Sequence, residues 1–247
     1  MLNLLTKRLK KLLESFGLNI RRVRAFDNCN RDIFPKATYS PWLQDETFLS
    51  TYNLISSNTL VDVYRLYELW KLLEEVQDIP GDVLEVGVWR GGTGCLLATC
   101  AKNLSIDGTV YLCDTFSGVV KAGNDDATYR GGEHSDTSED LVRNLLSKLG
   151  LDNFEILKGV FPDATSDSIS NNTFRLCHID VDVKKSADDI LSWVWPRLAA
   201  GGVIIYDDYG FYECDGIRRH VDEQRKKTDR LVIHNLNGHA IIVKIQE

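Results

Sequence analysis

The strongest constraint on the fold is the alternation of short apolar segments with amphipathic segments. Apolar segments of strand length lie at residues 82–87, 109–114, 154–158, 174–180 and 202–206. Amphipathic stretches of helical period separate or follow them, at about residues 93–103, 138–149, 185–198 and 215–227. Strands that alternate with helices pair in parallel through right-handed crossovers. The sequence therefore predicts an α/β fold with a doubly wound, mostly parallel sheet.

Both ends of this pattern extend the predicted fold. Two further apolar segments, residues 230–234 and 240–245, flank an Asn-Leu-Asn-Gly turn at residues 235–238. This combination predicts a β-hairpin, which would add antiparallel strands to the C-terminal edge of the sheet. Before the alternation begins, apolar residues repeat at helical spacing over residues 60–76, which predicts a long amphipathic helix that ends before Pro80.

The N-terminal residues differ from the rest in charge and pattern. Residues 1–24 hold seven basic side chains and one acid, and their apolar residues repeat at three-to-four spacing. They predict an amphipathic helix that either packs on the protein or a partner subunit, or lies on an anionic membrane. We favour packing or oligomer contact. Residues 25–58 show no clear period, so the expected division is an N-terminal helical and irregular extension at 1–58 and an α/β domain at 59–247.

The composition excludes several classes of protein. The 247 residues carry 36 Asp and Glu against 29 Lys and Arg, a net charge of −7, whereas a general nucleic-acid binder presents a basic face. No apolar run reaches the ~18 residues of a membrane span, and basic side chains interrupt any N-terminal secretory signal. The six cysteines form no Cys-x-x-Cys pair, which predicts reduced thiols. We expect a cytoplasmic protein that binds no nucleic acid and does not insert stably into membranes.

A glycine-rich turn follows the first predicted strand. The sequence from Glu85 to Gly94 leads into a helix, and its glycines let backbone amides approach a ligand at the helix N-terminus. It does not match the G-x-G-x-x-G dinucleotide fingerprint, because from Gly92 the third glycine position is Leu97. It does not match the P-loop either, because no lysine follows Gly92. The remaining pattern, an acid before Gly-x-x-x-Gly-Gly, suits a cationic ligand such as S-adenosylmethionine better than a pyrophosphate. The alternative is a turn that serves only helix–strand packing.

Carboxylates end three other predicted strands. Asp114 ends the second strand, where it could accept the ribose hydroxyls of a nucleoside or simply cap a turn. Asp180 and Asp182 end the fourth strand, and Asp207 and Asp208 end the fifth. Because the carboxyl ends of parallel strands form the ligand crevice, these four acids would repel one another unless a cation lies between them. Such oxygen ligands select Mg²⁺ or Ca²⁺ over zinc. Alternatively, the acids only begin solvated loops.

A long polar insert separates the second strand from the next predicted helix. Residues 116–136 are punctuated by glycines, and their length is typical of a functional lid, with a disordered surface loop as the alternative. His134 in the insert and His178 in the fourth strand are candidate acid–base groups. A single histidine more often has a packing or hydrogen-bonding role, so neither receives a catalytic assignment.

Together, these motifs resemble the macrocin O-methyltransferase (TylF-type) family over about residues 45–247. The motifs are Gly87-Val-Trp-Arg-Gly-Gly92, Asp114-Thr-Phe-Ser-Gly118, Gly131-Gly-Glu-His134, His178-Ile-Asp-Val-Asp182 and Tyr206-Asp-Asp208. The resemblance implies a class I methyltransferase fold and the modification of sugar hydroxyls in natural products with S-adenosylmethionine and Mg²⁺. The family pattern often has glycine where this chain has Val181, a change expected to narrow the pocket.

The resemblance also implies roles for individual residues. Asp180, Asp207 and Asp208 would hold the metal, and Asp182 would be the general base. The residues that would bind S-adenosylmethionine are Glu85, Gly87, Trp89, Arg90, Gly91, Gly92, Thr93, Asp114 and Ser117. Among them, Glu85 and the turn would face the methionine part, and Asp114 the ribose. Residues 59–247 would form the methyltransferase domain, and because family members usually self-associate, we expect a homo-oligomer.

The resulting prediction is a Mg²⁺-dependent O-methyltransferase acting on a hydroxyl of a sugar or glycosylated small molecule. Three alternatives remain at this stage. The first keeps the donor but methylates a catechol-type or amine acceptor. The second is a metal-dependent, sugar-nucleotide-modifying enzyme, which would need a basic phosphate clamp, and only Lys184 and Lys185 follow the acids. The third is a non-catalytic protein that binds an adenosyl ligand.

Overall fold

The chain forms two compact units, Met1–Ala37 and Thr38–Glu247. The computed structural model describes residues 13, 15, 16, 23–34 and 36–246. Most of the predicted N-terminal amphipathic helix lies outside these residues. In the first unit, Ala25 and Arg31 form an isolated antiparallel bridge across a turn. The domain boundary expected at residue 58 stays a prediction.

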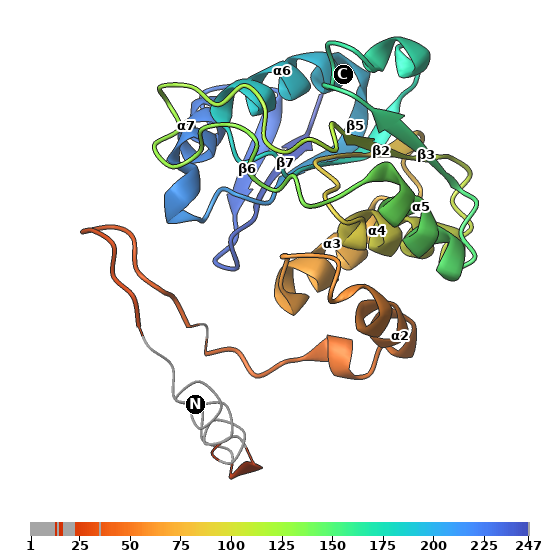
Figure 1. Cartoon of the computed structure of the whole chain (residues 1–247), viewed down its shortest axis with the longest axis horizontal. Coiled ribbons are helices and arrows are strands. Elements are labelled where there is room, and N and C mark those ends of the chain that lie inside the picture. Colours follow the sequence, from red (N-terminus) through yellow and green to blue (C-terminus); the bar gives the residue numbers. More distant parts are fainter. Residues whose placement is uncertain (1–12, 14, 17–22, 35, 247) are drawn as a thin grey trace. The chain divides into compact units, whose positions relative to one another are not determined.

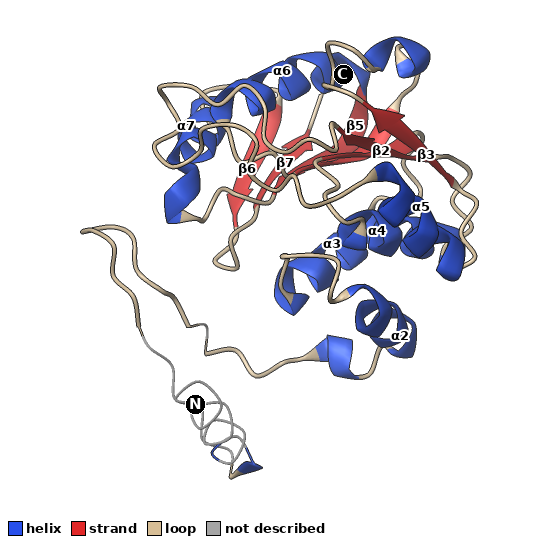
Figure 2. Ribbon diagram, in the orientation of Figure 1, coloured by secondary structure: helices blue, strands red, loops and turns tan. Residues whose placement is uncertain are grey.

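The second unit is built on one mixed sheet (Figure 2). Its strands are β1 (Asp82–Val86), β2 (Val110–Asp114), β3 (Phe154–Lys158), β4 (Phe174–Ile179), β5 (Leu198–Tyr206), β6 (Arg230–His234) and β7 (Ala240–Lys244). They lie in the order β3-β2-β1-β4-β5-β7-β6. Strands β1 to β5 are parallel, whereas β7 is antiparallel to both β5 and β6. The predicted doubly wound sheet with a C-terminal antiparallel hairpin is confirmed.

Helices cover both faces of this sheet (Figure 1). They are α2 (Glu46–Ile55), α3 (Val63–Glu75), α4 (Gly92–Asn103), α5 (Glu139–Lys148), α6 (Lys184–Val194) and α7 (Asp215–Gln224). Short 3-10 turns are η1 (Pro41–Leu43), η2 (Ser166–Ile169), η3 (Trp195–Arg197) and η4 (Tyr212–Cys214). Helices α2 to α5 lie on one face, and α6 and α7 on the other. Alternate strand residues enter the two cores, as Val83 packs in the core containing Leu66, and Leu84 in that containing Ile190.

Helix α2 corrects the expectation that residues 25–58 are irregular. The Asp45 side chain accepts a hydrogen bond from the Phe48 amide (2.9 Å) and caps the helix N-terminus. Phe48, Thr51 and Ile55 are buried, and their spacing places them on one helix face. This face has few apolar positions, so the sequence shows too few repeats of the helical period to reveal the helix.

The sheet changes its winding direction between β1 and β4, which are neighbours although β2 and β3 lie between them in the chain. Ligands of open α/β sheets bind at such a switch point, beyond the carboxyl ends of the strands. The acids predicted at the strand ends therefore lie at the edge where a ligand crevice is expected. In the described part of the chain, no helix has the length and apolar character needed to cross a membrane.

Candidate active site

A cavity of about 310 Å³ lies at the carboxyl ends of the parallel strands. The insert between β2 and α5 contributes one wall, and its anchors include contacts with α6 and with the glycine turn. Asp126 Oδ1 accepts a hydrogen bond from the Lys184 amide (2.9 Å) at the start of α6. Trp89 Nε1 and Arg90 Nη2 donate to Asp136 at 2.8 and 2.6 Å. These bonds tie the insert, called the lid below, to the glycine turn and to α6, and its function as a lid stays a prediction.

Part of the predicted donor-binding set reaches the cavity. The residues of this set that line it are Gly87, Trp89, Thr93 and Asp114. The residues that do not are Glu85, Arg90, Gly91, Gly92 and Ser117. A Cβ at Gly87 (φ +92°) would lie 1.7 Å from the Asp180 carbonyl oxygen, and one at Gly92 would lie 2.7 Å from the Asn58 carbonyl oxygen. Both glycines are therefore required for close backbone packing, besides any role in donor binding.

Asp114 organises the glycine turn through its carboxylate. Oδ2 accepts hydrogen bonds from the amides of Val88 (2.7 Å) and Trp89 (2.8 Å), and Oδ1 accepts one from Phe116 (2.7 Å). A carboxylate offers about four lone-pair positions, so backbone amides use most of its capacity. The turn-capping role considered for Asp114 is thus present. Its remaining capacity suits one ribose hydroxyl rather than two.

Glu85 lies behind the cavity rather than at its surface. The side chain is fully buried, and Oε1 lies 3.0 Å from His178 Nδ1. A Cβ at Gly94 of α4 would lie 2.8 Å from Glu85 Oε2, so this glycine makes room for the carboxylate on the α4 face of the sheet. In this structure the Glu85 carboxylate contacts His178 and does not line the cavity, so a direct contact of Glu85 with the methionine part of the donor stays a prediction.

The predicted convergence of acids is present in the cavity. Asp180, Asp207 and Asp208 each place one carboxylate oxygen within 4.8 Å of the others, and all three line the cavity. Burial, together with the charges of Asp207 and Asp208, raises the pKa of Asp180 well above its ordinary value. Burial likewise raises the pKa of Asp208, with the charges of Asp182 and Asp207 adding to the shift. These shifts express burial first and mutual repulsion second, and a bound cation would relieve the repulsion.

Arg65 of α3 compensates part of this negative charge, although the sequence analysis did not identify it. Its guanidinium pairs with Asp207 through Nη1 and with Asp62 through Nε (2.9 Å), and Cζ lies 4.7 Å from the ring centroid of Phe211. The side chain is 7% exposed. Burial lowers the pKa of Arg65, but the charges of Asp207 and Asp62 outweigh burial and raise it. The apolar period that predicted α3 gives no indication of a polar residue on its buried side.

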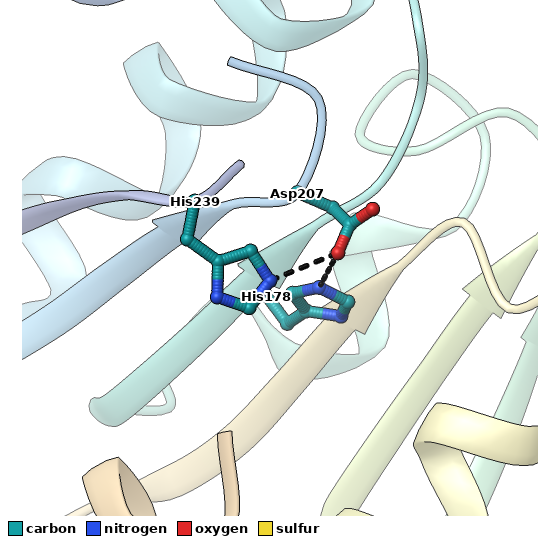
Figure 3. Close-up of side chains that lie close together, drawn as sticks. All are labelled: His178, Asp207 and His239. Atoms are coloured by element: carbon teal, nitrogen blue, oxygen red, sulfur yellow. Dashed lines mark hydrogen bonds and ion pairs between the residues drawn. The ribbon is translucent and has the colours of Figure 1, made fainter. Parts of the chain in front are cut away.

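Two histidines approach the other oxygen of Asp207 (Figure 3). His239 Nε2 lies 2.9 Å from Oδ1, and His178 Nε2 lies 3.8 Å from the same atom. Through Nδ1, His178 contacts Glu85 (3.0 Å) and His239 contacts Glu68 (2.6 Å). Burial lowers the pKa of His178, but interactions with the Asp207 and Glu85 carboxylates outweigh it and raise the pKa to about 10. Although burial acts in the opposite direction, both histidines and the guanidinium hold the pKa of Asp207 well below its usual range.

Asp182 lies in the same cavity, beside groups from the lid and from η4. Its amide donates to Asp208 Oδ2 (2.9 Å), and Cys214 Sγ lies 3.9 Å from Asp182 Oδ1. Burial raises the pKa of Asp182, while the hydrogen bond from Tyr129 and the charge of His134 act in the opposite direction. The net effect is a raised pKa, which makes Asp182 a stronger base than an exposed aspartate.

The residues present fit a hard divalent cation. The carboxylates of Asp180, Asp207 and Asp208 form a compact set of oxygen donors, which is the chemistry that Mg²⁺ and Ca²⁺ prefer. Together with Asp182 and Glu85, these acids outnumber the cationic side chains described above. A divalent cation would offset the excess negative charge.

Comparisons with known proteins identify the family of this chain. Residues 51–237 match the family model described as Macrocin-O-methyltransferase (TylF). The demethyldecarbamoylnovobiocin O-methyltransferase of Streptomyces niveus is 30% identical over 186 residues, which cover 70% of this chain and 70% of that protein. The mycinamicin III 3''-O-methyltransferase of Micromonospora griseorubida is 31% identical over 185 residues, covering 69% of this chain and 71% of that protein.

Solved structures support the same assignment. The O-methyltransferase NovP aligns with a TM-score of 0.67 and 26% identity, over 77% of this chain and 83% of NovP. The calicheamicin methyltransferase CalS11, at 15% identity, shares the fold with a TM-score of 0.64 over 84% of this chain and 94% of its own. Because the matched residues 51–237 contain the glycine turn, the lid and every acid of the cluster, the chain belongs to the macrocin-O-methyltransferase (TylF) family and is an S-adenosylmethionine-dependent O-methyltransferase.

Proposed function

We propose that this enzyme transfers the methyl group of S-adenosylmethionine to a hydroxyl of a sugar or glycosylated small molecule, in a Mg²⁺-dependent reaction. The family and the names of the relatives support the sugar acceptor. The observation that carries the metal dependence is the convergence of Asp180, Asp207 and Asp208 on the cavity that also contains the glycine turn. Cytoplasmic location and homo-oligomeric assembly remain predictions.

In this proposal, Asp180, Asp207 and Asp208 hold the Mg²⁺. When bound there, the ion supplies Lewis acidity that lowers the pKa of an acceptor hydroxyl. Asp207 is the ionised member of the set, because Arg65 and two histidines stabilise its negative charge. Asp180 and Asp208 hold their protons more tightly than ordinary aspartates and become ligands only when they lose them.

Asp182 is the proposed general base. It lines the cavity next to the acid cluster, and its raised pKa favours acceptance of a proton at neutral pH. The Tyr129 hydroxyl and the Cys214 thiol contact its carboxylate and hold it at the cavity wall. A base positioned in this way contributes about 10²–10⁴-fold to the rate of a proton transfer.

The methyl donor would lie along the glycine turn, where Gly87, Trp89, Thr93 and Asp114 line the cavity. The excess of carboxylates nearby favours a ligand with sulfonium and ammonium groups. Holding the donor beside the acceptor makes the methyl transfer effectively unimolecular, which supplies much of the acceleration. Direct donor contacts for Arg90, Gly91, Gly92 and Ser117 remain predictions.

In the described part of the chain, the lining of the cavity offers no unpaired arginine or lysine for a phosphate, which disfavours the sugar-nucleotide alternative. Among the described residues that line the cavity, Arg65 is the only arginine, and no lysine accompanies it. Its guanidinium is already paired with Asp62 and Asp207, so it offers no free clamp for a phosphate group.

The test is labelled methyl transfer to a panel of glycosides, catechols and amines, with and without EDTA. Wild-type enzyme should methylate a glycoside and lose that activity in chelator. Asp182→Asn should keep its affinity for S-adenosylhomocysteine in calorimetry but lose about 10²–10⁴-fold in turnover. Asp152→Asn, in which an exposed acid loses its charge, is the matched control and should behave as wild type.

Each arm of this experiment addresses one part of the proposal. Full activity in EDTA would remove the metal dependence and leave the donor assignment intact. Wild-type turnover of Asp182→Asn would remove its role as base. Transfer to catechols or amines, with no glycoside methylated, would replace the sugar acceptor.

A further inference from the structure

We propose that Glu68 and His239 are positioning residues that fix the Asp207 carboxylate for cation binding, an inference that rests on the proposed Mg²⁺ site. Neither residue lines the cavity, and neither contacts substrate or metal in this proposal. Both act through Asp207, which they connect to helix α3 and to the turn between β6 and β7.

The connection is continuous and buried. His239 is fully buried, with Nδ1 2.6 Å from Glu68 Oε2 and Nε2 2.9 Å from Asp207 Oδ1. Glu68 is held in turn by the side-chain amides of the hairpin turn: Asn235 Nδ2 donates to Oε1, and Asn237 Nδ2 donates to Oε2 (3.1 Å). The imidazole thus has no freedom to turn away from Asp207 without breaking a charge-assisted hydrogen bond.

The backbone of the turn adds to this rigidity. Asn237 Oδ1 accepts a hydrogen bond from the His239 amide (3.0 Å), and the Asn235 amide donates to the His239 carbonyl (2.9 Å). His239 directly precedes β7, which pairs with β5, the strand that ends next to Asp207. Side chain and backbone therefore place the imidazole in one position relative to the cavity.

Helix α3 fixes both oxygens of Asp207 at once. Arg65 pairs with Oδ2, and Glu68, one helical turn later, holds His239 against Oδ1. The carboxylate is thereby oriented before any cation arrives. Without the contacts from Arg65 and His239, the Asp207 carboxylate would be free to turn away from the like charges of Asp180 and Asp208.

Hydrogen-bond partners outside the ligand shell orient ligating carboxylates and histidines, and removing one costs about 10–100-fold in metal affinity. The same loss is expected here when the contact between His239 and Asp207 is removed. The cation would still reach its three ligands. The variant should therefore need more Mg²⁺ for saturation, while its turnover at saturating Mg²⁺ changes less.

Two substitutions of His239 separate its two contacts. In His239→Gln, the side-chain amide nitrogen reaches about the position of Nε2 and keeps the donor to Asp207. In His239→Asn, the amide nitrogen lies near the position of Nδ1, keeps the contact with Glu68 and loses Asp207. The matched controls are His220→Gln and His220→Asn, because His220 is also buried, between Asp188 and Tyr206, and does not line the cavity.

The readout is Mn²⁺ affinity, followed by electron paramagnetic resonance of the free ion, without donor or acceptor. We expect His239→Asn to bind Mn²⁺ about 10–100-fold more weakly, His239→Gln to recover much of the loss, and both His220 variants to match wild type. In turnover, His239→Asn should raise the KM for Mg²⁺ with a smaller effect on kcat. If His239→Asn does not fold, the variant to test is Glu68→Gln, because the Glu68 side chain is 20% exposed. This variant should also bind Mn²⁺ more weakly than wild type.

The outcomes separate this inference from the proposed function. Wild-type Mn²⁺ affinity in folded His239→Asn and Glu68→Gln would overturn the positioning role and leave the metal site standing. No Mn²⁺ binding by wild type would overturn both. His178, His239 and Asp207 also lie close enough to hold an ion themselves. Zn²⁺ binding that survives Asp180→Asn combined with Asp208→Asn but not His239→Asn would make the histidines ligands and overturn positioning.

Discussion

Replacing Arg65 with methionine tests how much the free energy of unfolding falls when Asp207 loses its buried cationic partner. Methionine keeps an apolar side chain of similar reach and removes the guanidinium. Arg65 and Asp207 are 7% and 6% exposed, so water does not replace the lost partner. The substitution therefore leaves the Asp207 carboxylate buried beside Asp180 and Asp208 without its paired cation.

The expected loss follows from these contacts. Breaking a buried ion pair by removing one partner costs about 3–5 kcal/mol. The cation–π contact with Phe211 adds up to about 2 kcal/mol, although methionine retains some of it through its sulfur. His178 and His239 still hold Asp207 in the variant, which moves the expectation to the lower end. We expect a loss of about 3 kcal/mol, roughly a hundredfold change in the folding equilibrium.

Urea unfolding followed by circular dichroism, at neutral pH and at low and high salt, measures this loss. Arg219→Met is the control, because Arg219 is 48% exposed and pairs with Asp215 at the surface, where a pair contributes about 0–1 kcal/mol. Arg65→Met combined with Asp207→Asn should recover much of the stability, because the buried Asp207 charge is no longer left without its partner, and the second partner of Arg65, Asp62, is 43% exposed. A loss below about 1 kcal/mol, or one that high salt removes, would refute the assignment of a buried pair.

Three further predictions concern other parts of the domain. Gly87→Ala should cost more than about 4 kcal/mol, because its Cβ would lie 1.7 Å from a carbonyl oxygen at φ +92°, and a wild-type melting temperature would contradict this. Asp114→Asn should lose about 1–3 kcal/mol and speed amide hydrogen exchange in the turn after β1, since an amide group cannot accept on both ends. Unchanged protection of those amides would argue against it. Burial raises the pKa of Asp188, but hydrogen bonds, first that with His220, outweigh it and lower the pKa to about 2. The stabilisation by Asp188 is therefore present above the ordinary pKa of 3.8 and is lost as pH falls through about 2. In urea unfolding, the free energy that Asp188→Asn loses relative to wild type should shrink over that pH window. A loss that stays constant would refute the linkage.

The fold could be predicted because the sheet is recorded in local sequence patterns. Each parallel strand is a continuous apolar run, and each is followed by a segment of helical period, so parallel pairing and the handedness of the crossovers follow from the chain alone. The hairpin of β6 and β7 was marked by its Asn-Gly turn, where Gly238 has φ +123°. Helix α2 carries only a few buried positions on ten residues, and its recognition requires knowledge of the helices it packs against.

The acids of the site could also be predicted, because adjacency in the sheet follows from topology. Ile179 of β4 pairs with Tyr206 of β5, so the residues after them, Asp180 and Asp207, lie side by side. The direction of the Glu85 side chain, in contrast, is set by strand geometry. Successive side chains of β1 point to opposite faces, and Glu85 shares the α4 face with Val83 rather than facing the crevice beyond the strand end.

What the strand ends cannot reveal is how three identical side chains come to differ. Asp207 has a lowered pKa because Arg65 and two histidines surround it, whereas Asp180 and Asp208 have raised values because burial and like charges dominate. Two of the residues that create the difference are Arg65 in α3 and His239 after the last helix, which lie 142 and 32 positions from Asp207, and no local period marks them. The site therefore contains one carboxylate whose ionised form its neighbours stabilise, and two carboxyls whose ionisation a bound cation would favour. Binding of a divalent ion at this site should therefore release protons and strengthen as pH rises, because Asp180 and Asp208 must lose their protons to become ligands.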